Sequence, residues 1–299
     1  MGQYWDVFCI DNRKRTGHLG KLAEAFYSEP HMLESRLVRH RTVEQPAPAT
    51  PPTAPLECLP PLVKRRICTF LAAVDVDGLL CVILSVPHLS AIGQAALNDH
   101  VSWAGKRIIT LGDYAKNVPQ NLLSADEEKC LLNRDDCSSY VLDRDVFDEI
   151  YGVSTSKAYP RAYEFSYARH EKRRTMNSHI PIEYLVNRSA PLPANRVLRN
   201  LTLKQYYRDD SQCNRQWCGC CTDDNVNDNF GVGQVVLIMT CWSEDYSTSF
   251  HANWTADDVH GEWAGHRLDI VASEKVAADW EDVTDVVRAK LMRLRDQPE

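Results

Sequence analysis

Residues 59–93 carry the pattern that most limits how this chain can fold. Their apolar side chains first recur every three or four residues, the spacing of one helix face: Leu59, Val63, Ile67, Phe70 and Leu71. Pro60 and Pro61 stand in the first turn of that helix, where proline is tolerated because the first amides have no intrahelical acceptor. A turn-like break at residues 75–78 precedes a second apolar run at residues 79–84. About 40 residues make too small a core to bury such faces alone, so this stretch needs a partner in the chain or in another protein.

Residues 43–55 separate that stretch from the start of the chain. Five of them are proline and most of the others are alanine or threonine, a composition that supports neither regular hydrogen bonding nor a core. The segment is therefore predicted to be a linker. Residues 1–42 precede it, with a strand expected at residues 4–10 and a helix at residues 19–27, and we expect them to pack on the C-terminal domain.

Residues 100–299 predict one strand-rich domain. Short β-branched or apolar runs between turn-forming residues predict strands at residues 107–111, 163–167, 182–186, 196–198, 234–242 and 266–271. Residues 273–295 have apolar side chains at helical spacing and end in basic residues, which predicts a terminal helix. The predicted fold class is α+β: a short helical module at residues 56–98, then a mixed, strand-rich C-terminal domain with a terminal helix.

A five-residue pattern occurs twice in that domain. Trp103-Ala-Gly-Lys-Arg107 returns as Trp263-Ala-Gly-His-Arg267. One short match is too little to define a repeat architecture. The pattern instead predicts two similar turns, in each of which glycine leads into a strand.

The charge balance excludes some partners and favours others. A formal net charge of −7 argues against nucleic-acid binding, because neutralising phosphates requires an excess of lysine and arginine. Residues 221–285 hold fourteen acidic residues against two basic ones, and the last third of the chain is rich in tryptophan: Trp217, Trp242, Trp254, Trp263 and Trp280. We expect most of these rings in the core, and one or two beside the acidic segment would suit a basic partner. The apolar runs are shorter than the roughly 18–20 residues of a membrane helix, so no membrane partner is expected.

The cysteines and histidines do not predict a catalytic or metal site. Eleven cysteines lie scattered without paired spacing or a secretory signal, so we expect reduced thiols and an intracellular location, in the cytoplasm, the nucleus or both. The densest cluster, Cys213, Cys218, Cys220 and Cys221, lacks the paired spacing of zinc knuckles, so we expect free thiols and no cofactor; a zinc-stabilised interaction domain is the alternative. Residues 231–233, Gly-Val-Gly, are expected to precede a strand, which would leave no phosphate loop. No histidine or acidic residue stands at a spacing that fixes it near a nucleophile, and we expect no enzyme activity.

Residues 59–93 resemble an F-box. The matching positions are Leu59-Pro60, Ile67, Leu71, Leu79-Leu80, Leu84 and Ser85, and the stretch departs from the family pattern at Leu62, Lys64 and Ser90. Outside the box the chain is similar to F-box-like proteins of mushroom-forming fungi, in residues 1–5, 20–22, 104–114, 196–202, 241–243 and 263–267.

This resemblance implies a non-enzymatic substrate receptor that links an unknown protein target to a cullin–RING ubiquitin ligase. The residues implied to contact the Skp-family adaptor are Leu59, Pro60, Ile67, Leu71, Leu79, Leu80 and Leu84. Two alternatives remain open. The helical module packs only on its own domain, or the C-terminal domain is an enzyme or small-ligand-binding protein for which the module is a scaffold.

Overall fold

The computed structural model describes residues 3–16, 19–28, 30–38, 55–56, 58–119, 123–132, 141–142, 195–209, 230–247 and 254–296. Helices and a mixed sheet occur together in these stretches, which confirms the predicted α+β class. The strands predicted at residues 163–167 and 182–186 lie outside the described residues, as does nearly all of the proline-rich segment.

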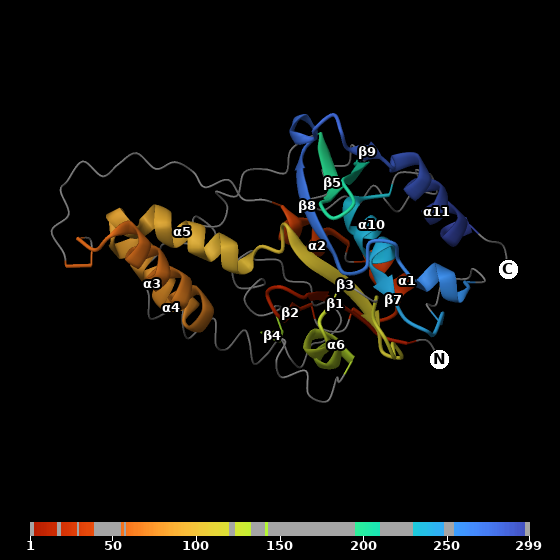
Figure 1. Ribbon diagram of the computed structural model, residues 1–299, viewed down its shortest axis with the longest axis horizontal. Coiled ribbons are helices and arrows are strands. Elements are labelled where there is room, and N and C mark those ends of the chain that lie inside the picture. Colours follow the sequence, from red (N-terminus) through yellow and green to blue (C-terminus); the bar gives the residue numbers. More distant parts are fainter. Residues whose placement is uncertain are drawn as a thin grey trace.

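A nine-stranded mixed sheet forms the centre of the body, by which we mean the described residues outside 55–101. Its strands are β1 (Trp5–Cys9), β2 (Lys14–Arg15), β3 (Lys106–Gly112), β4 (Val141–Leu142), β5 (Arg196–Asn200), β6 (Gln205–Arg208), β7 (Cys241–Trp242), β8 (His266–Ala272) and β9 (Glu281–Asp282). They follow in the order β4-β2-β1-β3-β8-β5-β6-β9, and β7 pairs with β3 (Figure 1). The N-terminal strand β1 thus lies inside the sheet, antiparallel to β3 over five residue pairs.

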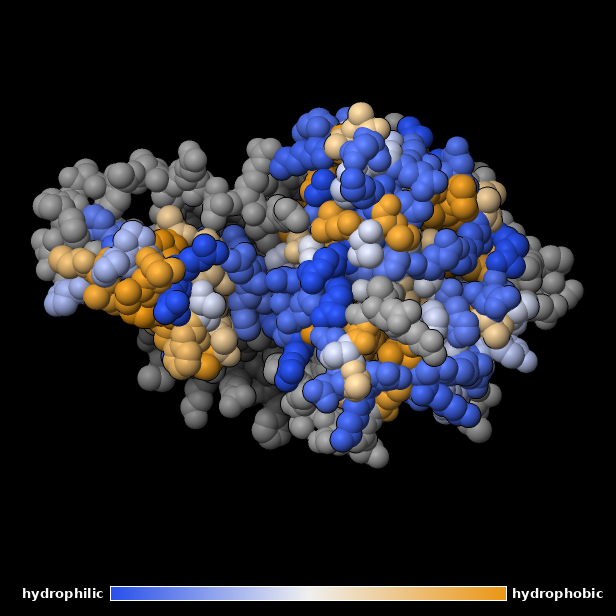
Figure 2. Space-filling view, viewed as in Figure 1, coloured by the Kyte–Doolittle hydropathy of each residue, from blue (hydrophilic) through white to orange (hydrophobic). Residues whose placement is uncertain are grey.

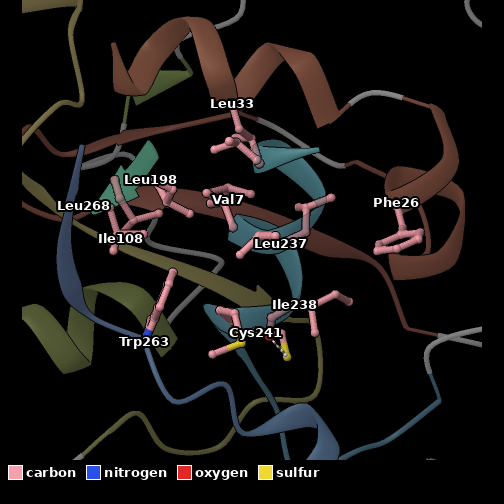
Figure 3. Close-up of a cluster of buried hydrophobic side chains, with 14 of the residues drawn as sticks. Val7, Phe26, Leu33, Ile108, Leu198, Leu237, Ile238, Cys241, Trp263 and Leu268 are labelled. Atoms are coloured by element: carbon pink, nitrogen blue, oxygen red, sulfur yellow. Dashed lines mark hydrogen bonds between the residues drawn. The ribbon is translucent and has the colours of Figure 1, made fainter. Parts of the chain in front are cut away.

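Helices cover both faces of the sheet, because β1 places apolar side chains on each of them. All five residues of β1 are buried. Trp5, Val7 and Cys9 join the core formed with α1 (Leu22–Ser28), α2 (Pro30–Leu37), α10 (Val232–Met239) and α11 (Thr284–Asp296). Figure 3 shows this core around Val7, Leu33 and Leu237. Phe8 belongs to a second core on the opposite face, with Leu131 of α6 (Ala125–Leu132).

The strand predicted at residues 234–242 is wrong over most of its length. Residues 232–239 form helix α10, and only Cys241 and Trp242 are in a strand. Seven of the eight residues of α10 are buried, so the helix is apolar nearly all round and shows no amphipathic period. The C-terminal helix was also predicted too long, because α11 starts at Thr284, where the Asp282 carboxylate accepts the amide of Thr284 at 3.0 Å.

The two Trp-Ala-Gly sequences form the predicted pair of similar turns. Gly105 and Gly265 both have φ of +76°, in the left-handed region that glycine reaches without strain, and each leads into a strand. The turns lie against each other, because the amide of Gly105 donates to Leu268 O at 2.7 Å and that of Gly265 donates to Ile108 O at 2.8 Å. The repeated sequence therefore pairs with itself where β3 meets β8.

That self-pairing places two like charges opposite each other. Arg107 and Arg267 are direct cross-strand partners, an arrangement that is unfavourable by itself. Asp11 lies between them, with Oδ1 2.7 Å from Arg107 Nε and Oδ2 3.0 Å from Arg267 Nη1. Glu127 adds a second carboxylate 2.6 Å from Arg107 Nη2, and its hydrogen bond raises the pKa of Arg107.

Three helices project from the body as a separate module (Figure 1). They are α3 (Pro61–Val74), α4 (Val76–Ser85) and α5 (Pro87–Val101). The body holds the C-terminal end of α5, where Lys14 Nζ donates to His100 O at 2.9 Å and the amide of Trp103 donates to Arg36 O at 2.8 Å. The module is thus joined to the sheet through one helix end, and α5 leads directly into β3.

Candidate docking surface

Proline and aspartate set the ends of the module's first two helices. Pro61 stands in the first turn of α3 as predicted, and the break predicted at residues 75–78 is confined to Asp75. The amide of Asp75 closes α3 by donating to Leu71 O at 2.8 Å, and its carboxylate caps α4 by accepting the amide of Gly78 at 2.9 Å. One residue therefore turns the chain between two helices that must pack side by side.

The inner faces of the three helices form a core of their own. It contains Cys68 and Ala72 of α3, Leu79, Leu80 and Ile83 of α4, and Ala96 and Leu97 of α5. Burial raises the pKa of the Cys68 thiol. Gly93 of α5 lets α4 approach closely, because a Cβ at Gly93 would lie 2.5 Å from Ile83 Cγ1. This small core is separate from the two cores of the body.

The outer face of α3 presents large apolar side chains to solvent. Leu62, Val63, Phe70 and Val74 are 63%, 40%, 65% and 62% exposed. Val63, Phe70 and Val74 follow at spacings of seven and four, and Leu62 precedes Phe70 by eight, so all four share one side of the helix. We call these four residues the α3 face. Apolar residues gather over the module in the surface view (Figure 2).

The predicted adaptor-binding residues fall into three groups around that face. Pro60 is exposed, and Leu59 and Ile67 are half-buried. Leu71 is also half-buried but packs against the module core, and Leu79 and Leu80 are inside that core. Leu84 lies in α4, and its side chain is outside what the structure describes. Among the members whose side chains the structure describes, Leu59, Pro60 and Ile67 thus lie near the surface, whereas Leu79 and Leu80 are buried.

The α3 face includes residues that the family pattern did not select. Leu62 is one of the positions at which the chain departs from that pattern, and here it extends the exposed apolar face. Val63 and Phe70 were on the predicted helix face, whereas Val74 had no sequence signal beyond its spacing of four from Phe70. The spacing of apolar residues alone could not distinguish the buried face of α3 from its solvent-exposed face.

Basic side chains border the α3 face. Lys64, Arg65 and Arg66 follow Val63 directly, and Arg66 precedes Phe70 by four residues, which places it beside the apolar side chains. Arg65 Nη2 lies 3.8 Å from Asp99 Oδ2 of α5, with both side chains more than 70% exposed, so this pair adds little stability. Lys64, Arg65 and Arg66 therefore give the first half of α3 a local positive charge, whereas the exposed Asp75 follows Val74 at its C-terminal end.

The body's buried histidine and cysteine side chains have structural partners. Burial lowers the pKa of His266, whose Nδ1 lies 2.9 Å from Asn200 Nδ2. Burial raises the pKa of Cys241 to about 12, which keeps it a thiol at neutral pH. No group of three or more His, Cys, Asp or Glu that could hold a metal occurs among the residues that the structure describes. Cys213, Cys218, Cys220 and Cys221 lie outside those residues.

The Gly-Val-Gly sequence opens a helix, which corrects the expectation that it precedes a strand. Gly231 is the N-cap of α10, and its amide donates to Gln234 Oε1 at 2.9 Å. The amide of Gly233 donates to Glu34 Oε1 at 3.3 Å, and Glu34 Oε2 pairs with Arg196 at 3.0 Å. The chain's own carboxylate therefore occupies the position that a phosphate would take at a helix N-terminus.

Of the last-third tryptophans that the structure describes, two are in the core and two are half-buried. Trp254 and Trp263 are buried, as expected, whereas Trp242 and Trp280 are half-buried, and Trp217 lies outside the described residues. Trp242 stacks on His260 with ring centroids 4.4 Å apart, and Arg199 lies 5.1 Å above Trp280.

Comparison with known proteins adds no family or fold neighbour. No family model, curated protein or solved structure matches the chain. In the part of the chain that the structure describes, no helix is both long and apolar enough to cross a membrane.

Proposed function

We propose that the chain is a non-enzymatic substrate receptor whose helical module docks on a Skp-family adaptor through the α3 face. The observation that carries the proposal is the concentration of exposed apolar area on this helix. In the described part of the chain, ten large apolar side chains are exposed, and four of them belong to α3. A helix face of this kind, flanked by basic residues, suits an apolar groove on another protein.

The separate module core supports the same proposal. Because the inner faces of α3, α4 and α5 already bury one another, the α3 face is not needed to stabilise the module. The adaptor contacts implied by the F-box resemblance are accordingly revised to Leu62, Val63, Phe70 and Val74, with Pro60 and Ile67 at their border. Leu79 and Leu80 support these contacts from inside the module. The chain then acts in the compartment of the ligase, inside the cell.

The test is binding of the full-length chain to a purified Skp-family adaptor, measured by isothermal titration calorimetry. The double variant Val63→Asp/Phe70→Asp should weaken binding by at least about thirtyfold, because it introduces charges at two central apolar contacts. Thermal unfolding should stay near that of the wild type, since both side chains are exposed. Leu71 is a poorer position for this test, because its side chain packs on the module core and a substitution there would also destabilise the module.

Ala91→Asp is the matched control, because Ala91 is an exposed residue of α5 in the same module. This variant should bind the adaptor like the wild type. Absence of wild-type binding, or equal binding by the α3 double variant, would rule out the proposal.

A further inference from the structure

A second group of exposed aromatic side chains lies at the far end of β3 from the module. Tyr4, Tyr114 and Tyr246 are 53%, 52% and 57% exposed. Together with the α3 face they account for seven of the ten large apolar side chains exposed in the described part of the chain. Single exposed apolar residues are normal on protein surfaces, but a concentration of them marks a binding site.

A buried glutamine joins the three segments that carry these tyrosines. Gln3 is completely buried, and its backbone amide donates to Ser247 O at 3.3 Å. Ser247 directly follows Tyr246. Its Oε1 accepts the amide of Tyr114 at 3.3 Å. The amide of Tyr4 donates to Asp113 Oδ2 at 3.2 Å, and the amide of Asp113 donates to Tyr4 O at 2.9 Å. The tyrosines therefore stand on a fixed backbone, and ordering them in a complex costs little entropy.

Carboxylates lie in the same segments as the tyrosines, where they also accept backbone amides: Glu244 those of Lys116 and Asn117, and Asp245 that of Ser247. Glu244 and Asp245 directly precede Tyr246, and Asp113 lies between β3 and Tyr114. The amide of Ser243 donates to Val259 O at 3.2 Å, which brings the short helix η3 (Ala256–Val259) and its exposed Asp257 alongside. Lys116 and Arg293, which pairs with Asp258 of η3, bring positive charge to the same region. The region is thus both aromatic and acidic.

We propose that this tyrosine surface (Tyr4, Tyr114, Tyr246, Asp113, Glu244 and Asp245) binds a partner protein through an extended segment rich in arginine or lysine. Aromatic faces attract such cations, and neighbouring carboxylates pair with them. Arginine fits best, because its planar guanidinium both stacks on rings and donates to carboxylates. The same negative charge repels nucleic acids and anionic lipid surfaces.

The position of the tyrosine surface allows it to act together with the module. The turn at residues 102–105 and the seven residues of β3 separate it from the end of α5, and β3 alone spans about 20 Å. Figure 1 shows β3 running from the end of α5 across the body. A partner segment held here and a protein held by the α3 face therefore occupy different ends of the molecule. Binding of the basic segment does not rest on adaptor docking, and the two are tested separately.

The experiment titrates the full-length chain into a fluorescein-labelled peptide of about ten residues that alternates arginine and serine, followed by fluorescence anisotropy in buffer of physiological ionic strength. Saturable binding is expected, with no binding of the glutamate–serine counterpart. Replacing all three tyrosines with alanine should weaken binding by about tenfold or more. This variant keeps the net charge, so the loss would measure the aromatic contribution alone.

Tyr27→Ala serves as the control, because Tyr27 is 63% exposed on α1 and is not in one of the three segments that Gln3 joins. It should bind the arginine peptide like the wild type, and so should Val63→Asp/Phe70→Asp. The proposal is overturned if the arginine peptide does not bind saturably, if the glutamate peptide binds equally well, or if the triple tyrosine variant stays within about twofold of the wild type.

Discussion

Arg196 shows how much of the body depends on one side chain. It pairs with Glu34 of α2 and with Asp209 after β6, and all three side chains are at least 88% buried. Glu34 in turn accepts an amide at the start of α10. One guanidinium therefore neutralises two buried carboxylates and fixes the helix that fills the main core.

Arg196→Met is expected to lower the free energy of unfolding by about 3–5 kcal/mol, because it keeps the side-chain length and removes the positive charge that lies against two buried carboxylates. Urea unfolding measures the change. Arg208→Met is the control, since Arg208 is 51% exposed and its pair with Asp282 should contribute less than about 1 kcal/mol. Similar losses in the two variants would contradict this reading of the buried triad.

Among the secondary-structure elements, turns that require one residue type were predictable from the sequence. Elements whose form depends on the neighbours packed over them were not. The Trp-Ala-Gly turns were predictable because their glycines adopt a left-handed conformation. Helix α10 was not predictable, because a segment that is buried on all sides shows the hydrophobic period of neither a helix nor a strand. The one local indication of a helix start was Gln234, whose side chain caps the first turn.

The burial of the predicted docking residues could not be deduced from the sequence for the same reason. Periodicity assigned the apolar positions of α3 to one helix face and gave residues 79–84 only as an apolar run. The neighbours that cover Leu79 and Leu80 are set by tertiary packing. The tyrosine surface could not be predicted at all, because its tyrosines come from positions 4, 114 and 246, and only the sheet brings them together. The local patterns contain no information about that assembly.

The last turn of α5 should make the module's attachment sensitive to pH. Burial, and then the nearby ammonium group of Lys14, lowers the pKa of His100 from its ordinary 6.5 to about 4. Between these values the unfolded chain binds a proton that the folded chain does not, so stability is full above pH 6.5 and falls as the pH drops toward 4. Allowing for partial solvent screening, we expect a loss of about 1–2 kcal/mol.

Urea unfolding at pH 7 and pH 4.5, for the wild type and for His100→Gln, isolates this contribution. The variant should lose less stability over the interval, and a residual loss should remain because burial also lowers the pKa of His266. If both proteins lose the same free energy of unfolding between pH 7 and pH 4.5, protonation of His100 does not weaken the attachment of α5.

At the scale of the whole molecule, one strand connects the two proposed binding surfaces. The α3 face lies on the projecting module, the tyrosine surface lies beyond the other end of β3, and α5 leads into β3 through the Trp103 turn (Figure 1). A receptor that presents a bound target to a ligase needs a defined orientation between such sites. The contacts at the end of α5 set that orientation.

Lys14 is the contact whose removal should loosen the module without unfolding the body. It is 4% exposed, and its ammonium group donates to His100 O, at the end of α5 where the helix dipole is negative. Lys14→Met keeps the apolar stem and loses the charged hydrogen bond, which should destabilise the last turn of α5 by about 1.5–3 kcal/mol. Hydrogen exchange followed by mass spectrometry should show faster exchange at residues 96–104 and unchanged exchange in α10.

The same variant should raise the pKa of His100, because the nearby positive charge that lowers it is gone. NMR titration of the histidine ring measures that shift independently of exchange. Lys116→Met, which removes an exposed ammonium group far along the chain, should change neither quantity. If exchange at residues 96–104 stays as slow as in the wild type while the pKa of His100 rises, then Lys14 acts on His100 only through its charge, and the orientation of the module is set by the bond from Trp103 to Arg36 instead.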